Sequence, residues 1–116
     1  MTKLGQNISN VFSGDDWTGR FTITGSVSSS GEDVTGASIV WVLFNSPTGS
    51  SVIRKTSAST GHITISSSVV DVNVAASDTS GLVGDYYHEL QITRLSDGKV
   101  QTAAVGWVTI NRDLIS

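Results

Sequence analysis

The sequence predicts an all-β domain, a two-sheet Greek-key sandwich of about seven strands, and three observations lead to this prediction. The dominant hydrophobic period along the chain is two, as in a strand whose side chains alternate between two faces. No window places apolar residues at helical spacing between capping residues. Turn-forming residues recur roughly every 8–12 positions. Because the chain has 116 residues, one modest core is expected, and residues 1–116 are predicted to form a single domain.

The first predicted strands carry much of the expected core. Residues 17–27 alternate apolar and polar side chains, with Phe21 and Ile23 on the inner parity. Residues 37–45 form the next strand, between a turn rich in Ser and Gly and a turn that contains the single proline. At that position the missing N–H of proline removes no hydrogen bond from a sheet.

The rest of the chain continues as short strands joined by turns. Residues 84–94 alternate clearly, and residues 96–99, with Asp-Gly at their centre, are a strong hairpin signal. Residues 74–77 are the one possible helical turn, which could form a short crossover. The other strands are predicted at residues 52–56, 61–66, 70–74 and 100–110. The predicted core consists of Phe21, Ile23, Ile39, Trp41, Leu43, Tyr86, Leu90 and Ile92.

The number and spacing of these strands favour a single immunoglobulin-like Greek-key sandwich, with a small barrel as the main rival. Trp41 lies in the middle of its strand, where sandwiches of this class often bury a tryptophan, and Tyr86 stands where they often carry a corner tyrosine. Cysteine is absent, so this would be a disulfide-free variant, and thiolate chemistry and cysteine-rich zinc sites are excluded.

Composition also limits the classes of partner. Charged residues make up 15% of the chain, below the roughly 25% typical of soluble proteins. The formal net charge is −3, and no cluster of Lys and Arg is present to neutralise phosphates, which disfavours nucleic acid as a partner. Residues 1–10, a possible N-terminal arm, lack the apolar stretch of a signal peptide, and no apolar run approaches the roughly 20 residues of a membrane span. We therefore expect synthesis in a cytoplasm and no membrane partner.

The strand at residues 37–45 is apolar on both faces, which is unusual for a sheet that faces water. Its second face carries Val40, Val42 and Phe44, where an isolated domain would be expected to show Thr or Lys. We predict that a neighbouring chain covers these side chains. Coverage by residues 1–10 of the same chain is the alternative.

The face to which Trp107 points depends on the hairpin register. A two-residue turn at Asp97-Gly98 would pair Leu90 with Val105 and turn Trp107 into the core. A three-residue loop with Gly98 in the left-handed conformation would shift the register by one residue. We favour the second register, in which Val105 and Trp107 face outward on the same sheet as Val42.

Several segments together resemble the immunoglobulin-like domains of tailed bacteriophages. They are GDDW at 14–17, DVTGASIVWVLFN at 33–45, GDYYHELQITRLSDGKVQT at 84–102 and the closing Gly-x-Val-x-Ile at 106–110. The pattern is similar to the N-terminal domain of baseplate upper proteins and to small β-sandwich proteins of phage tails and collars, from about residue 11 to residue 110. The resemblance implies a structural protein of the virion that docks onto other virion proteins, often in a symmetric homo-oligomer or ring. Baseplate upper proteins continue into a long C-terminal region, so the length of this chain favours a collar, connector or decoration subunit.

The residues offer no clear catalytic or metal site. His62 and His88 both lie near serines, as any histidine would in so serine-rich a chain, and neither belongs to a nucleophile-elbow sequence. A histidine hydrogen-bonded in or beside a sheet is the favoured interpretation of His88. The adjacent acids at 15–16 and 32–33 could share a cation if their loops converged, although solvated turn acids are the commoner case. We therefore predict no enzyme, no cofactor and no metal.

Aromatic residues support a second hypothesis, a carbohydrate-binding or adhesion module. Five rings could offer a stacking platform for sugars, although core packing already accounts for two of them. They are Trp17, Trp41, Trp107, Tyr86 and Tyr87. A sugar module is expected to be monomeric with rings exposed side by side, whereas a structural subunit should form a symmetric assembly.

Overall fold

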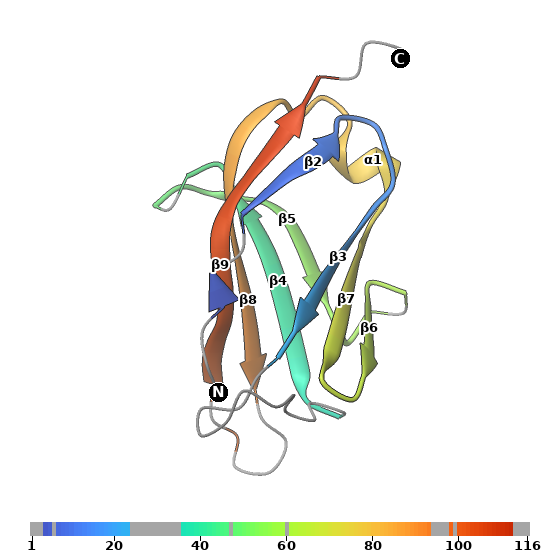
Figure 1. Ribbon diagram of the computed structural model, residues 1–116, viewed down its shortest axis with the longest axis vertical. Helices are drawn as coiled ribbons and strands as arrows, with labels where there is room; N and C mark the ends of the chain where they lie inside the picture. Colours follow the sequence, from blue (N-terminus) through green and yellow to red (C-terminus); the bar gives the residue numbers. More distant parts are fainter. Residues whose placement is uncertain are drawn as a thin grey trace.

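The chain folds into two β-sheets that pack face to face (Figure 1). The computed structural model describes residues 4–5, 7–23, 36–46, 48–59, 61–93, 98 and 100–112, with the backbone alone for Leu4. Within these ranges the strand-rich, two-layer architecture confirms the predicted all-β class.

The larger sheet has the strand order β1-β9-β8-β4-β5, and β2 also pairs with β9. Its strands are β1 (Leu4–Gly5), β2 (Ile8–Phe12), β4 (Ser38–Phe44), β5 (Ser51–Thr56), β8 (Gly84–Thr93) and β9 (Val100–Asn111). The smaller sheet has the order β3-β7-β6. Its strands are β3 (Trp17–Thr22), β6 (Ile63–Ser66) and β7 (Val69–Val74). A single helical turn, α1 (Ala76–Thr79), connects β7 to β8 close to where the sequence predicted a crossover.

The seven predicted strands correspond to β3 to β9. The predicted continuation of the first strand to residue 27, the turns at 28–35 and at Pro47, and most of the hairpin turn at 94–99 lie outside the described residues. The N-terminal arm was not predicted as strand, yet β1 and β2 extend the large sheet in parallel with β9. Figure 1 shows β2 running beside β9 along this edge.

A bulge in β9 sets the register that decides where Trp107 points. Leu90 pairs with Ala104, while the next residue of β8, Gln91, pairs with Thr102, so β9 holds one extra residue at this point. Ala103 and Ala104 are both buried, which two small side chains permit. Gly98 has the expected left-handed φ of +70°, but Thr93 pairs with Val100, one residue away from the register that a three-residue loop would give. The bulge restores the predicted register from Leu90 to Trp107. In this register Trp107 points away from the core, and 46% of its surface is exposed.

The core lies between the two sheets and includes most of the predicted residues. Buried are Phe21, Ile23, Ile39, Trp41, Leu43, Leu90 and Ile92. Tyr86 is only partly buried and packs against the edge of this core, since it stands near the start of β8. The sequence did not indicate the contributions of Ile8, in the predicted arm, and of Val11, just after it. Both belong to β2 and enter the core.

Candidate functional site

Three cross-strand rows of side chains form the outward surface of the large sheet. Residues of β4 at even positions point outward, because the odd positions between them are buried. The rows are Phe44, Tyr87 and Trp107; Arg54, Val42, Glu89 and Val105; and Thr56, Val40, Gln91 and Thr102. We call these residues the outer face.

All the residues predicted for an interface belong to this outer face: Val40, Val42, Phe44, Val105 and Trp107. The first four are partly buried by their neighbours on the same surface. Trp107 contacts Tyr87 edge to face, with ring centroids 5.7 Å apart and an interplanar angle of 76°. The pair lies side by side across β8 and β9.

A hollow of about 230 Å³ lies over β4 on the outer face. Its floor is apolar, and long polar side chains from β5 and β8 stand on either side. It is lined by Val40, Val42, Phe44, Arg54, Glu89 and Gln91. Among the ion pairs of the described part of the chain, none includes Arg54 or Glu89. Both charged groups therefore border the hollow without a charged partner there.

The outward surface of the small sheet offers an internal comparison. Its central ion pair joins Arg20 of β3 to Asp71 of β7, with Nε and Oδ1 2.9 Å apart. The guanidinium lowers the pKa of Asp71, chiefly through this hydrogen bond. The other outward residues there are polar except for one valine: Thr18, Thr22, Thr64, Ser66, Val69 and Asn73. This surface has the composition expected for contact with water, and the outer face of the large sheet does not.

The described part of the N-terminal arm lies at the β9 edge of the large sheet, and Ile8 and Val11 point into the core. The side-chain oxygen of Asn7 accepts a hydrogen bond from the backbone N–H of Trp107 at 3.0 Å. Nδ2 of Asn111 donates to the carbonyl oxygens of Ser9 and Val11, at 2.8 and 3.1 Å. These contacts place the described arm residues beside β9, so they do not supply the alternative cover for β4.

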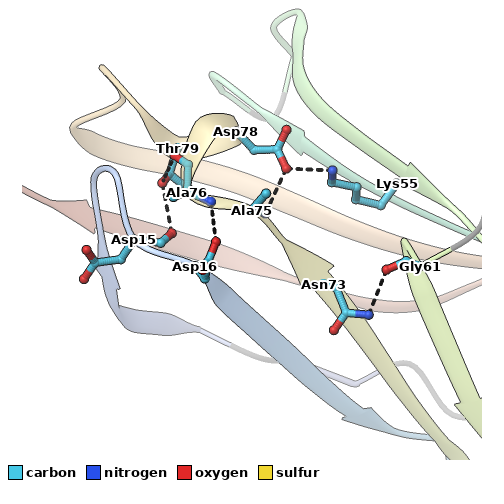
Figure 2. Close-up of polar contacts among 9 residues, drawn as sticks. All are labelled: Asp15, Asp16, Lys55, Gly61, Asn73, Ala75, Ala76, Asp78 and Thr79. Carbon is cyan, nitrogen blue, oxygen red and sulfur yellow. Dashed lines mark hydrogen bonds and ion pairs between the residues drawn. The ribbon is translucent and has the colours of Figure 1, made fainter.

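A second, larger cleft of about 440 Å³ opens near α1, between β3, β7 and Lys55 of β5. Lys55 lies on the inner side of β5 and is 7% exposed, and its Nζ is 2.7 Å from Oδ2 of Asp78 (Figure 2). Burial alone would raise the pKa of Asp78. Hydrogen bonds from Lys55 and from the Ala75 N–H, with the charge of Lys55, outweigh burial and hold that pKa below its ordinary value. This ion pair connects β5 to α1.

The adjacent acids at 15–16 are fastened to α1, one through its carboxylate and the other through its backbone carbonyl. Oδ1 of Asp16 accepts a hydrogen bond from the Ala76 N–H at 2.7 Å, and the Thr79 hydroxyl donates to the carbonyl oxygen of Asp15 (Figure 2). These contacts fasten the turn before β3 to α1. The acids at 32–33 lie outside the described residues.

The aromatic residues divide between the interior and the outer face. Trp17 and Trp41 meet inside the sandwich, with ring centroids 6.0 Å apart, and Tyr86 packs at its edge. Of the five rings proposed for a sugar platform, Tyr87 and Trp107 lie together on the outer face, in one row with Phe44. The five rings do not form one platform.

The two histidines, the remaining candidates for a site, lie in different parts of the fold. His88 is fully buried and its Nδ1 accepts a hydrogen bond from the indole N–H of Trp41, while His62 lines the second cleft, near α1. Among the described residues no three His, Asp or Glu side chains group together as metal ligands.

The helical residues in the described ranges include no segment long and apolar enough to cross a membrane. No protein-family model and no curated protein matches this chain.

Proposed function

We propose that this chain is a non-enzymatic structural protein of a tailed-phage virion, which docks onto other virion proteins through its outer face. The observation that carries the proposal is the contrast between the two outward surfaces. Val40, Val42 and Phe44 project from the central part of the large sheet, whereas Arg20 and Asp71 occupy the matching part of the small sheet. A contiguous apolar patch rimmed by polar side chains is typical of a protein interface.

The strand order supports the immunoglobulin-like part of the proposal. Strands β9, β8, β4 and β5 lie against β3, β7 and β6, as strands G, F, C and C′ lie against B, E and D in a variable-type sandwich. Together with the sequence resemblance to phage domains, this supports a role as a collar, connector, baseplate or decoration subunit.

The free energy of burying the three β4 side chains is too small to offset the cost of association, so other residues of the outer face must contribute to the contact. Fully burying a Val or Phe side chain stabilises a contact by at most about 1.5–3 kcal/mol, and association costs about 4–15 kcal/mol in lost freedom. The three β4 side chains are already partly buried, so they do not suffice alone. Tyr87 and Trp107 add the aromatic area that a stable contact requires.

The test is incorporation into particles of the phage that encodes the chain. Val42→Lys places a charge in the hollow, and Thr64→Lys places the same charge on the exposed surface of the small sheet as a matched control. We expect both variants to fold, and only Val42→Lys to be lost from purified particles. Absence of the wild-type chain from particles would contradict the virion role, and equal incorporation of both variants would contradict the role of the outer face.

Carbohydrate binding is the second candidate, favoured by the exposed ring of Trp107. The edge-to-face arrangement with Tyr87 offers a sugar one ring face rather than two coplanar ones. A glycan-binding screen of the wild type and Trp107→Ala measures this function directly. Specific binding that disappears in the variant, by a chain that is monomeric and missing from particles, would establish it in place of the first.

A further inference from the structure

We propose that the hollow over β4 receives the Trp107 side chain of a second copy of this chain, so that two copies associate by a reciprocal contact. This inference rests on the proposed function, because it names the partner of the same outer face. It also predicts which side chain inserts and what the hollow provides for it.

The lining of the hollow matches the chemistry of an indole ring. Val40, Val42 and Phe44 supply an apolar floor for the body of the ring. Arg54 stands on one side, where a guanidinium can lie over an indole face, the strongest of the aromatic partners for a cation. Glu89 stands on the other side, where its carboxylate can accept a hydrogen bond from the indole N–H.

Of the three tryptophans of this chain, Trp107 is the most exposed and is the one that lies on the outer face. Trp41 is buried, and Trp17 is partly buried against it. Trp107 is 46% exposed on the same outer face as the hollow. The hollow and the inserting side chain therefore occur together on one surface.

Trp107 cannot fill the hollow of its own chain. It lies on β9, two strands from β4, a separation of about 10 Å, and Tyr87 of β8 stands between Trp107 and Phe44 in their row. In a two-fold dimer each copy inserts its Trp107 into the other, and one kind of contact is made twice. The contact also gives Glu89 a hydrogen-bond donor and Arg54 an aromatic face, whereas neither has an ion-pair partner among the described residues.

Two variants separate the inserting side chain from the hollow. Trp107→Ala removes the side chain and keeps the hollow, whereas Val42→Phe fills the hollow and keeps the side chain. Sedimentation equilibrium over a concentration series up to about 1 mM measures the dimer dissociation constant. We expect a wild-type dimer, and at least tenfold weaker self-association of each variant alone. Thr64→Ala, on the surface of the small sheet, should associate as the wild type does.

An equimolar mixture of the two variants gives the sharper result. Each mixed pair keeps one intact contact, so the mixture should form a dimer more tightly than either variant alone. Arg54→Gln is a further variant, and because Arg54 is exposed, this substitution should leave the fold unchanged. It should also weaken the dimer. A wild-type chain that stays monomeric throughout, or a Trp107→Ala dimer as tight as the wild type, would overturn the inference.

The outcomes distinguish this inference from the proposed function. A monomeric chain whose incorporation into particles still depends on Val42 would overturn the reciprocal contact alone. A dimer that requires Trp107, formed by a chain missing from particles, would keep the reciprocal contact and overturn the virion role.

Discussion

The indole N–H of Trp41 donates a hydrogen bond to Nδ1 of His88 across β4 and β8, at 3.0 Å, and both side chains are buried. This contact satisfies the only polar atom of the largest buried side chain. The His88 ring also lies 5.7 Å from Phe21 of the small sheet, measured between ring centroids. One imidazole thus satisfies a buried donor and packs against the opposite sheet.

Replacing His88 by Leu should destabilise the fold, because the Trp41 N–H would be left buried without an acceptor. An unsatisfied buried donor costs about 1–3 kcal/mol. Urea unfolding followed by fluorescence measures the change in free energy. Gln91→Leu, an exposed position on the same strand, is the control and should change stability by less than about 0.5 kcal/mol. Equal effects of both substitutions would contradict the importance of the hydrogen bond.

Asp78→Asn should also destabilise the protein, since it leaves the ammonium of Lys55 in a largely buried place without its carboxylate. Removing one partner of a fully buried pair costs about 3–5 kcal/mol. The side chain of Asp78 is 28% exposed, so we expect about 2 kcal/mol. The double variant Lys55→Met with Asp78→Asn should recover part of this loss. No recovery would mean that the two side chains act independently.

The same ion pair predicts how stability depends on pH. The pKa of Asp78 is lowered from 3.8 in the folded chain, so the stabilisation is complete above that value and is lost as the pH falls through the folded-state pKa. The stability difference between the wild type and Asp78→Asn should therefore be constant near neutral pH and shrink below pH 3.8. The pKa of Asp71 is also lowered, so its contribution to stability is likewise lost as the pH falls. Because the Arg20 guanidinium is exposed, Asp71→Asn should show a smaller version of this profile. A difference that grows on acidification would contradict the assignment.

The β8–β9 register predicts opposite behaviour for two residues of one strand. Trp107→Ala should lower the free energy of unfolding of the monomer by less than about 1 kcal/mol, since the ring points outward. Ile110→Ala should cost about 2–5 kcal/mol, because this side chain is 2% exposed. Denaturant titrations below the dimer concentration range measure both. A larger loss for Trp107 than for Ile110 would indicate the other register.

The contacts of Asn111 predict how the N-terminal arm is held. Asn111→Ala removes the two hydrogen bonds to the Ser9 and Val11 carbonyl oxygens, at the place where the pairing of β2 with β9 is irregular. We expect faster amide hydrogen exchange in β2, with little change in β4. Thr109→Ala, which loses a hydrogen bond to Asp85 on the other side of β9, is the control. Unchanged exchange in β2 would show that Ile8 and Val11 hold the arm without these bonds.

Alternation along the chain predicted strands such as β3 and β8, in which one face is apolar and the other polar. The strand β4 does not alternate, and its apolar residues between two turns predicted it instead. The arm was missed for a physical reason. Its buried residues, Ile8 and Val11, are three positions apart, which breaks the period of two, and the register shift between them lets both face the core. The bulge at Ala103 was not apparent either, because two alanines fit either face.

The sequence predicted which side chains of the candidate site point outward, but not which residues of neighbouring strands lie beside them. The side to which Val42 and Phe44 point follows from the burial of Trp41 between them. The placement of Arg54 and Glu89 on either side of Val42 depends on the registers of three strands, which the sequence does not reveal. The sequence contained one indication of the ion pair between Lys55 and Asp78: Lys55 lies two residues after the buried Ile53 and so points to the same side of β5. Its partner lies on a different element and could not be inferred.

A map of the intact virion at side-chain resolution tests the central claim most directly. We predict that this chain is found on the particle with Val40, Val42 and Phe44 covered by protein, while Arg20 and Asp71 on the small sheet face solvent. A particle in which this chain occurs with its outer face open to solvent, and the small sheet at the contact, would contradict the account.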